Sequence, residues 1–446
     1  MVKKAKVSYV CSACGAMYSS WAGKCTNCGE WNTILEKLAV TTATAKQSGT
    51  KLQLRSIDEV AKSKPLERIK ANIGDMDDVL GGGIVPGSVI LLAGQPGIGK
   101  STLLMQVAAN IAKNHKVMYI SGEESAEQVA MRASRLGSGG ASLMLATSTS
   151  ANDVASTVAS ESVDLVVVDS IQTLACSEIS SAAGSVSQIT NSTQLITQAA
   201  KATNTALLIV GHVTKEGSIA GPKVLEHLVD VVLQLEGDRY GGFKVLRAVK
   251  NRFGSTNEAS IFDMQEGGLK PVENPSAALL AERQVSDGSV VLATLEGNRP
   301  LLVEVQALVN TSSYGYPKRT ASGFDINRLN LLVAVLEKRT KLNLSDKDIF
   351  INIVGGLKIN DPAADLAVCM AIGSAAKGLK LSKDAVVYGE VGLSGEIRHV
   401  PQAEKRVAEG KKLGFELAVG PKYKSNKLTF LHPVSDVREA LNTFLQ

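Results

Sequence analysis

Short apolar runs alternate with helix-forming segments through the middle of the chain. The runs are VILLAG (89–94), VMYIS (117–121), LMLAT (143–147), DLVVVDS (164–170) and ALLIVGHV (206–213). Unbroken apolar stretches of this length predict strands that are buried on both faces, as in a parallel sheet. The segments between them, such as Leu103–Lys113 and Ser187–Thr203, are compatible with helices. The pattern therefore predicts an α/β domain.

The pattern changes further along the chain. Strand-like segments VVLQLEG, FKVLRAVKNR and ASIFDM follow with short connections, which predicts an antiparallel extension of the sheet. VENPSAA (272–278) then interrupts the pattern, and VVLATLEG and LLVEVQALV, joined through 298–300, predict a hairpin. We expect an α/β domain over 56–273 and an α+β domain over 274–446.

Four of the six cysteines form two CxxC pairs near the start: Cys11, Cys14, Cys25 and Cys28. A glycine follows each pair and permits the left-handed backbone of a metal-binding knuckle. Disulfides or a redox pair would also use such cysteines, but a duplicated pair favours a structural zinc ion with no open coordination position. The sequence predicts a zinc module over 1–36 whose core holds Trp21 and Trp31, and a flexible linker over 37–55 that tethers it separately.

Length and composition narrow the class of protein. At 446 residues, the chain is expected to form two or three domains. It has no apolar run near the roughly 20 residues of a membrane span and no secretory signal at its start, so we expect a cytoplasmic protein without membrane contact. The net charge of +5 is compatible with nucleic-acid binding and equally with an ordinary solvated surface.

The first apolar run leads into a phosphate-binding motif, GxxxxGK[ST], that precedes a helix-forming segment. Its glycines let backbone N–H groups face phosphate oxygens, Lys100 is placed to reach the β and γ phosphates of ATP, and the Ser101 hydroxyl can ligate Mg²⁺. The predicted nucleotide-binding residues are Gly94, Gln95, Pro96, Gly97, Ile98, Gly99, Lys100, Ser101 and Thr102.

Acidic residues follow two further predicted strands. Asp169 ends LVVVD, where it is a candidate for holding Mg²⁺, although an aspartate at this position is often just a helix N-cap. Glu123 and Glu124 follow VMYIS, where a carboxylate can activate the attacking water. We favour Glu123 as the catalytic base, with Glu124 as the second candidate, and one of the two can simply begin the next helix.

Several of these motifs carry a family resemblance. DVLGGGIVPGS (78–88), the phosphate-binding loop and SGEES together resemble the RecA, DnaB and KaiC superfamily of ATPases, and KNRFG (250–254) and GHVTKEG (211–217) are similar to the bacterial RadA (Sms) family. The resemblance implies a DNA-dependent ATPase of recombinational repair. It further implies a hexameric ring that binds single-stranded and branched DNA, promotes branch migration and works with a RecA-type recombinase.

The resemblance also suggests roles for particular segments. Lys250 and Arg252 would act in the nucleotide site of a neighbouring subunit, where they would stabilise charge on the transferring phosphoryl group. The alternative is that they form a basic strand end that contacts only solvent or DNA phosphate. The loops 175–187 and 213–222 correspond to DNA-contacting loops, although both lack aromatic residues and can be ordinary surface loops. His212 could sense the γ phosphate or be structural.

The C-terminal third resembles the proteolytic domain of Lon, most clearly in DPAADLA (361–367) and GEVGLSGEI (389–397). Ala363 stands where Lon has its serine nucleophile, and Arg406, beside Lys405, stands at the position of the base. Without a hydroxyl nucleophile we expect no peptidase activity. An ATP-dependent peptidase and a KaiC-like nucleotide-gated switch remain the alternatives to a DNA motor.

Overall fold

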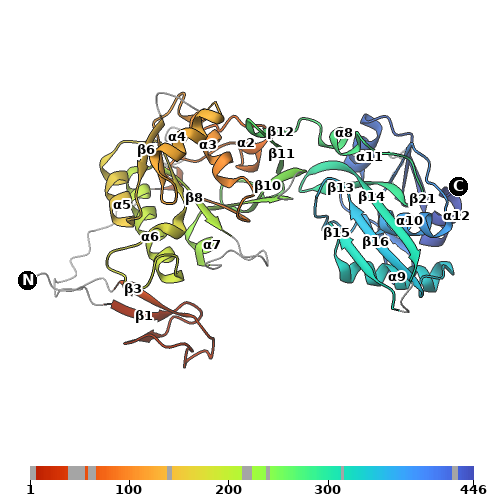
Figure 1. Ribbon diagram of the computed structural model, residues 1–446, viewed down its shortest axis with the longest axis horizontal. Helices are drawn as coiled ribbons and strands as arrows, with labels where there is room; N and C mark the ends of the chain where they lie inside the picture. The colour runs from red at the N-terminus through yellow and green to blue at the C-terminus, as the bar shows by residue number, and fades with distance from the viewer. Residues whose placement is uncertain are drawn as a thin grey trace, which may run out of the picture. The chain divides into compact units, whose positions relative to one another are not determined.

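A computed structural model of the protein describes residues 7–38, 56–58, 67–137, 143–212, 224–237, 242–312, 316–423 and 430–446. The chain divides into two compact units (Figure 1). The first comprises Met1–Glu236, Leu246–Thr256 and Gln265–Lys270, and the second comprises Gly237–Val245, Asn257–Met264 and Pro271–Gln446. Among the described residues, no helix combines the length and apolar character needed to cross a membrane.

The parallel strands of the first unit belong to a nine-stranded sheet with the strand order β12-β11-β10-β9-β4-β8-β7-β5-β6. The strands are β4 (Val89–Gly94), β5 (Val117–Ser121), β6 (Leu143–Thr147), β7 (Leu165–Asp169), β8 (Ala206–His212), β9 (Val231–Gly237), β10 (Phe243–Asn251), β11 (Ala259–Gln265) and β12 (Gly268–Pro271). From β9 to β6 every neighbouring pair is parallel. The five apolar runs therefore form parallel strands, as predicted.

Helices connect these strands. They are α2 (Met76–Val79), α3 (Lys100–Ile111), α4 (Ala126–Arg135), α5 (Ala151–Ser160), the short η1 (Ile171–Thr173), α6 (Val186–Thr203) and α7 (Val224–Leu228). Serine side chains accept hydrogen bonds from the first turns of α4, α5 and α6, which fixes where these helices begin. All residues of β4, β5 and β7 are buried, as the continuous apolar runs require.

The strand register sets up a site at one edge of the sheet. Ser121, the last residue of β5, pairs with Asp169, the last residue of β7. Gly94, the last residue of β4, opens the phosphate-binding loop. Because parallel strands end at the same edge, the loop, the SGEES segment and Asp169 share one side of the sheet.

The N-terminal part of the first unit is a small three-stranded sheet with the order β2-β1-β3. Its strands are β1 (Val7–Cys11), β2 (Met17–Tyr18) and β3 (Ile34–Leu38). Its buried core consists of Cys11, Cys25 and Ile34. Trp21 and Trp31 are 60% and 66% exposed, so the expectation that they fill this core was wrong: the module is too small to enclose two indole rings, and its metal-binding cysteines occupy the interior.

The second unit contains a seven-stranded sheet with the order β15-β16-β14-β13-β17-β20-β21, and a separate pair, β18 and β19. The strands are β13 (Ser289–Glu296), β14 (Arg299–Thr311), β15 (Arg319–Ser322), β16 (Lys347–Ile353), β17 (Ala385–Val387), β18 (Glu390–Val391), β19 (Ile397–Arg398), β20 (Leu417–Pro421) and β21 (Leu431–Val434). The helices are α8 (Pro275–Leu280), α9 (Ile326–Thr340), α10 (Ala364–Lys377), α11 (Ala403–Lys412) and α12 (Val437–Phe444). β13 and β14 form the predicted antiparallel hairpin.

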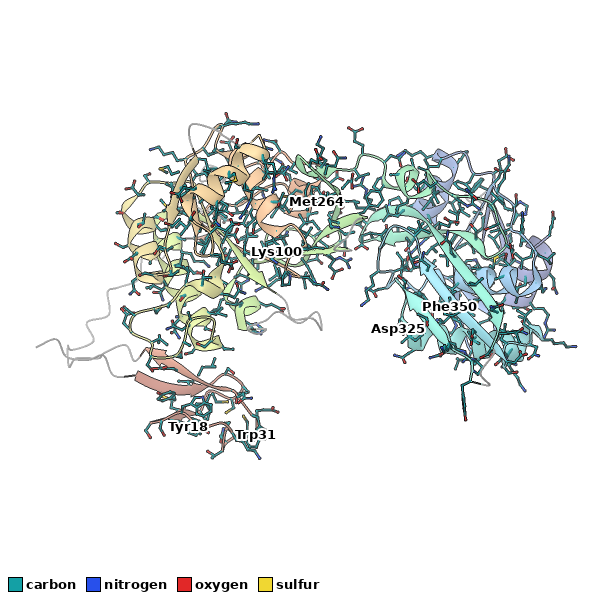
Figure 2. The ribbon with its side chains drawn as sticks, in the orientation of Figure 1. Tyr18, Trp31, Lys100, Met264, Asp325 and Phe350 are labelled. Carbon is teal, nitrogen blue, oxygen red and sulfur yellow. The ribbon has the colours of Figure 1, made fainter. Side chains whose placement is uncertain are left out.

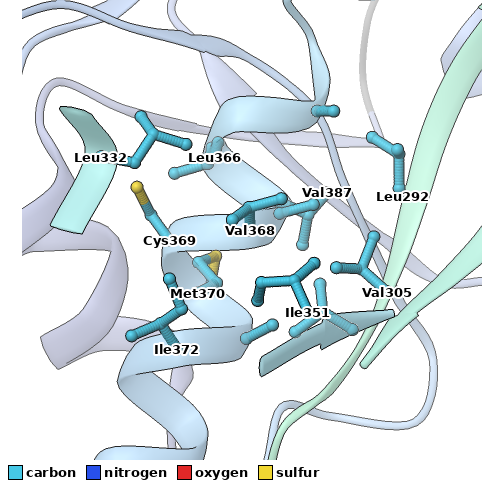
Figure 3. Packing of buried hydrophobic residues seen from close by; sticks show 14 of the residues in the cluster. Leu292, Val305, Leu332, Ile351, Leu366, Val368, Cys369, Met370, Ile372 and Val387 are labelled. Atoms are coloured by element: carbon cyan, nitrogen blue, oxygen red, sulfur yellow. The ribbon is translucent and has the colours of Figure 1, made fainter. Parts of the chain in front are cut away.

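Helix α10 lies at the centre of the core of this unit (Figure 3). Every residue from Ala364 to Ser374 is buried, because β13 and β14 cover one side of the helix and α9 and α12 pack on it as well. Cys369 belongs to this core and is fully buried, so it acts as a packing residue.

Candidate nucleotide site and zinc centre

The phosphate-binding loop joins β4 to α3. Gly97 and Gly99 have φ values of +79° and +110°, and Gly99 is the N-cap of α3. A Cβ atom at Gly94 would lie 2.7 Å from the carbonyl oxygen of Leu235, so only glycine fits where the loop begins. The first N–H groups of a helix have no intrahelical acceptors, and α3 directs them at the loop. This arrangement can bind a polyphosphate.

Lys100, labelled in Figure 2, is the charged residue of the loop and is buried. Its Nζ donates hydrogen bonds to the carbonyl oxygens of Gly94, at 2.9 Å, and Gln95, at 3.0 Å. Burial lowers the pKa of Lys100 to about 8, against an opposing effect of the Asp169 and Glu123 carboxylates. The ammonium group thus donates to neutral carbonyl groups, and a phosphate can replace these acceptors with anionic oxygens, which bind a cation more strongly.

Asp169 ends β7 in a buried position. The hydroxyl group of Tyr119 donates a 2.6 Å hydrogen bond to its Oδ2. Burial, and after it the Asp169 carboxylate, raises the pKa of Tyr119. The Asp169 carbonyl oxygen accepts a 2.8 Å hydrogen bond from the N–H of Gly122. These contacts fix a carboxylate at the sheet edge that carries the loop, where a hard cation prefers oxygen ligands.

The two glutamates have different neighbours. Glu123 accepts a hydrogen bond from the Ser170 hydroxyl and is close enough to Lys100 to act on its pKa. Glu124 instead forms an ion pair with Arg132 of α4. The Glu123 side chain therefore lies near the phosphate-binding loop, whereas the Glu124 side chain is bound to α4.

The four cysteine Sγ atoms lie within 4.8 Å of one another. The Sγ atoms of Cys11 and Cys28 are 3.7 Å apart, and those of Cys14 and Cys25 are 3.5 Å apart. Zn–S bonds of about 2.3 Å in a tetrahedron place sulfur atoms roughly 3.8 Å apart, whereas a disulfide requires about 2.05 Å. The donor set therefore fits a zinc ion, and all six cysteines, which lie in the described part of the chain, are free of disulfides.

Comparison with known proteins adds family information. A model described as an AAA domain matches residues 58–218, a rubredoxin metal binding domain matches 9–36, and subunit ChlI of Mg-chelatase matches 329–424. The chain is 45% identical over 440 residues to "DNA repair protein RadA" of Aquifex aeolicus, covering 98% of this chain and 99% of the relative. It is 44% identical over 454 residues to the protein of the same name in Bacillus subtilis, covering 99% of each. The chain belongs to the RadA family of DNA repair proteins.

This membership confirms the predicted resemblance and the predicted fold class. A RecA-like ATPase core, a four-cysteine zinc ribbon and a Lon-like C-terminal domain occur in the RadA-family chain. Among solved structures, a crystal structure of the RadB recombinase aligns with a TM-score of 0.38 and 22% identity, covering 46% of this chain and 100% of that one.

The two cations of the KNRFG segment contact the end of α7 and the residues that directly follow it. Lys250 Nζ donates to the carbonyl oxygens of Glu226, at 2.5 Å, and Val229, at 2.7 Å, at the end of α7, and burial lowers its pKa. Arg252 forms a 3.0 Å ion pair with Asp230, although 56% of its side chain is exposed. Both cations therefore have partners within this chain.

The glycine of KNRFG meets the DVLGGG segment. A Cβ atom at Gly254 would lie 2.7 Å from the Cα of Gly81, and one at Gly81 would lie 2.9 Å from the Cα of Gly254. Arg68 strengthens this contact by donating a 2.9 Å hydrogen bond to the carbonyl oxygen of Phe253. Two of the family motifs are thus packed backbone against backbone.

The last strand of the zinc ribbon contacts the ATPase fold. The Ser180 hydroxyl lies 3.1 Å and 3.3 Å from the carboxylate oxygens of Glu36. Ser187 Oγ, at 2.7 Å, and Asn191 Nδ2, at 3.1 Å, donate to the Glu36 carbonyl oxygen. The ribbon therefore lies on α6 and on the 175–187 loop. Most of the linker predicted over 37–55, the whole 213–222 loop and the His212 side chain lie outside the described residues.

The Lon-like domain keeps an ion pair where a protease has its catalytic pair. Ala363 is the N-cap of α10 and is buried. Arg406 is 1% exposed and donates to Asp361 Oδ2, at 2.6 Å, and to the Ala293 carbonyl oxygen, at 2.9 Å. The guanidinium group keeps its charge and cannot act as a general base, and Thr294 Oγ1, which donates a 3.0 Å hydrogen bond to the same Asp361 oxygen, therefore has no base beside it at Arg406.

Tyr119, Ser170 and Arg132 were not among the predicted site residues. Ser170 directly follows Asp169, so its proximity could have been inferred from the sequence. Tyr119 lies inside an apolar strand, and Arg132 lies two helical turns beyond Glu124. Only the strand register and the direction of α4 bring these two side chains to Asp169.

Proposed function

We propose that this RadA-family protein is a DNA-dependent ATPase of recombinational repair that acts in the cytoplasm. In this proposal it forms a hexameric ring, binds single-stranded and branched DNA, and uses ATP to drive branch migration beside a RecA-type recombinase. The observation that carries the proposal is the grouping of Lys100, Asp169 and Glu123 at one sheet edge in a chain of a DNA-repair family.

The proposed nucleotide site uses the loop residues 94–102. The backbone N–H groups at the start of α3 bind phosphate oxygens, Lys100 reaches the β and γ phosphates, and Thr102 lies near the α phosphate. Ser101 and Asp169 offer a hydroxyl and a carboxylate, which are hard oxygen donors suited to Mg²⁺. When bound, Mg²⁺ would neutralise charge on the phosphates.

Glu123 is the proposed general base. Its carboxylate accepts a hydrogen bond from Ser170, which fixes its orientation, and it can accept the proton of a water molecule aligned with the γ phosphate. Glu124 is the weaker candidate because its carboxylate is paired with Arg132.

Lys250 and Arg252 are proposed to link DNA to hydrolysis. Lys250 binds the carbonyl groups at the end of α7, and α7 follows the 213–222 loop that the family resemblance assigns to DNA. Arg252 has a half-exposed guanidinium group that is available to a neighbouring subunit, where it would stabilise the charge of the transferring phosphoryl group.

The test is steady-state ATP hydrolysis with and without single-stranded DNA. We expect the wild type to be stimulated by DNA, Lys250→Ala to lose that stimulation, and Lys100→Ala to lose turnover by about two orders of magnitude with an unchanged circular dichroism spectrum. Wild-type turnover by Lys100→Ala would refute the nucleotide site. Turnover that ignores DNA would favour a nucleotide-gated switch, and ATP-dependent degradation of casein would revive a peptidase.

A further inference from the structure

Arg132 lies between two acids of the nucleotide site. Its Nη2 is paired with the Glu124 carboxylate, and its Nη1 is 3.6 Å from Asp169 Oδ2, the oxygen that also accepts the Tyr119 hydrogen bond. The Arg132 side chain is only 12% exposed. Within the described part of the chain, its buried Nη1 has no hydrogen-bond partner. The guanidinium group is therefore held by charge at Asp169 and by a direct bond at Glu124, and it lies close enough to the Tyr119 hydroxyl to oppose the rise in the pKa of Tyr119.

The local charge balance explains why a cation is needed here. Asp169 is buried, and a buried carboxylate is strongly destabilising unless a cation lies nearby. Besides Arg132, Lys100 is close enough for the Asp169 carboxylate to raise its pKa, but Lys100 also serves the phosphate-binding loop. An arginine keeps its proton under all physiological conditions, so Arg132 supplies a fixed positive charge. This is the electrostatic role that Mg²⁺ would play at the same carboxylate.

The backbone fixes Arg132 relative to the glutamates. Ser125, which directly follows Glu124, is the N-cap of α4 and forms a capping box with Gln128. The Ser121 hydroxyl also binds the backbone N–H and carbonyl group of Glu124. Hydrogen bonds thus tie the segment that carries the glutamates to the start of the helix that carries Arg132.

We propose that Arg132 is a positioning residue that holds Glu124 on α4 and serves as the resident cation of Asp169 until magnesium nucleotide binds. The proposal rests on the use of Mg²⁺ with ATP in the proposed function. It makes Arg132 the residue that separates the two neighbouring glutamates, leaving Glu123 toward the phosphates. It also makes Arg132 an electrostatic competitor of the metal ion.

The experiment measures the Mg²⁺ concentration that half-saturates binding of a fluorescent ATP analogue to the full-length protein. Arg132→Met removes the competing charge and releases Glu124, so we expect this concentration to fall by about tenfold. Glu124→Gln frees Arg132 to approach Asp169, so we expect a rise. The double variant loses one charge of each sign and should return close to the wild-type value.

Arg135→Met is the matched control, since Arg135 is an exposed arginine in the same last turn of α4, and it should leave the Mg²⁺ dependence unchanged. A folded Arg132→Met variant with a wild-type Mg²⁺ titration would overturn the proposal. If Arg132→Met does not fold, Arg132→Lys decides: it keeps the charge and should stay within about twofold of the wild type, and a drop of about tenfold would contradict the charge argument.

The outcome can be separated from that of the proposed function. The predicted Mg²⁺ pattern in a protein whose ATPase ignores DNA would uphold Arg132 and refute the DNA motor. Wild-type nucleotide binding that does not depend on Mg²⁺ would overturn the role of Arg132, because there would be no cation for it to replace, while stimulation by DNA could still be observed.

Discussion

Lys100 stays among the carbonyl groups of its own loop, and this environment has a measurable consequence. Its pKa of about 8 lies below the ordinary lysine value of 10.5, so near pH 9 most of the empty sites hold a neutral amine. Phosphate groups favour the charged form and raise this pKa again. We therefore predict that ATP binding takes up nearly one proton at pH 9 and almost none at pH 7, measured by calorimetry in buffers of different ionisation enthalpy.

The lowered pKa of Lys100 also makes the free energy of unfolding depend on pH. Between about pH 8 and 10.5 the unfolded chain binds more protons at Lys100 than the folded chain, so this residue makes stability increase with pH in that window. Lys100→Arg is the control, because its guanidinium group keeps its proton and should bind ATP without proton uptake. Equal uptake by both proteins would show that another group titrates.

Individual site residues could be predicted where a short motif fixes the local geometry. The glycines and Lys100 lie within one loop, and each CxxC pair forms one turn, so spacing alone identifies them. Arg132 and Tyr119 depend on tertiary neighbours. The sequence analysis favoured Glu123 over Glu124, but the different partners of the two side chains, Ser170 and Arg132, depend on the fold and could not be predicted.

The contact between the DVLGGG and KNRFG segments leads to a prediction about packing. Gly81 has a φ of +78° and faces the Gly254 Cα, whereas Gly97 has a φ of +79° with nothing within 4 Å of a Cβ. Gly97→Ala should cost only the strain of its backbone, about 1 kcal/mol, while Gly81→Ala should cost an additional 1–3 kcal/mol or so through overpacking. Thermal unfolding without nucleotide measures both changes.

Similar losses of stability in the two variants would show that the backbones can separate at no cost. Gly254→Ala provides a second approach to the same contact, because its Cβ would lie 2.7 Å from the Gly81 Cα. If the contact is as close as described, this variant should be destabilised as well. A separate loss of DNA stimulation in either variant would connect this packing to the proposed role of Lys250.

At the scale of elements, the parallel strands were predictable because a strand that is buried on both faces must be apolar throughout. The hairpin of β13 and β14 was predictable for a related reason, since its turn interrupts two apolar runs. The packing of the zinc ribbon was not. Trp21 and Trp31 are large and apolar, but an interior of Cys11, Cys25 and Ile34 has no room for them.

At the scale of the whole molecule, the sequence predicted three parts because each has its own motif. It did not predict that the ribbon lies on α6 and the 175–187 loop. The contact uses Glu36, Ser180, Ser187 and Asn191, which are ordinary polar residues, and one acceptor is a backbone carbonyl group. Composition carries no information about such a pairing.

Removal of zinc should therefore destabilise the ATPase fold at the start of α6, where the ribbon contacts it. β3 pairs with β1 from Val7↔Leu38 to Cys11↔Ile34, and the cysteines anchor this pairing, so chelation or Cys14→Ser should unfold the ribbon and withdraw the Glu36 carbonyl group. Losing the hydrogen bonds from Ser187 and Asn191, at about 1 kcal/mol each, should speed amide hydrogen exchange in the first turns of α6 by about tenfold or more.

Nucleotide affinity should stay within about twofold of the untreated protein, because no ribbon residue contacts the loop residues 94–102 among the described hydrogen bonds and ion pairs. Ser180→Ala, which removes only the bond to the Glu36 carboxylate, should give a smaller change in exchange. Unchanged exchange in α6 would mean that the contact is not stable in solution, and a collapse of nucleotide binding would mean that the ribbon supports the whole first unit.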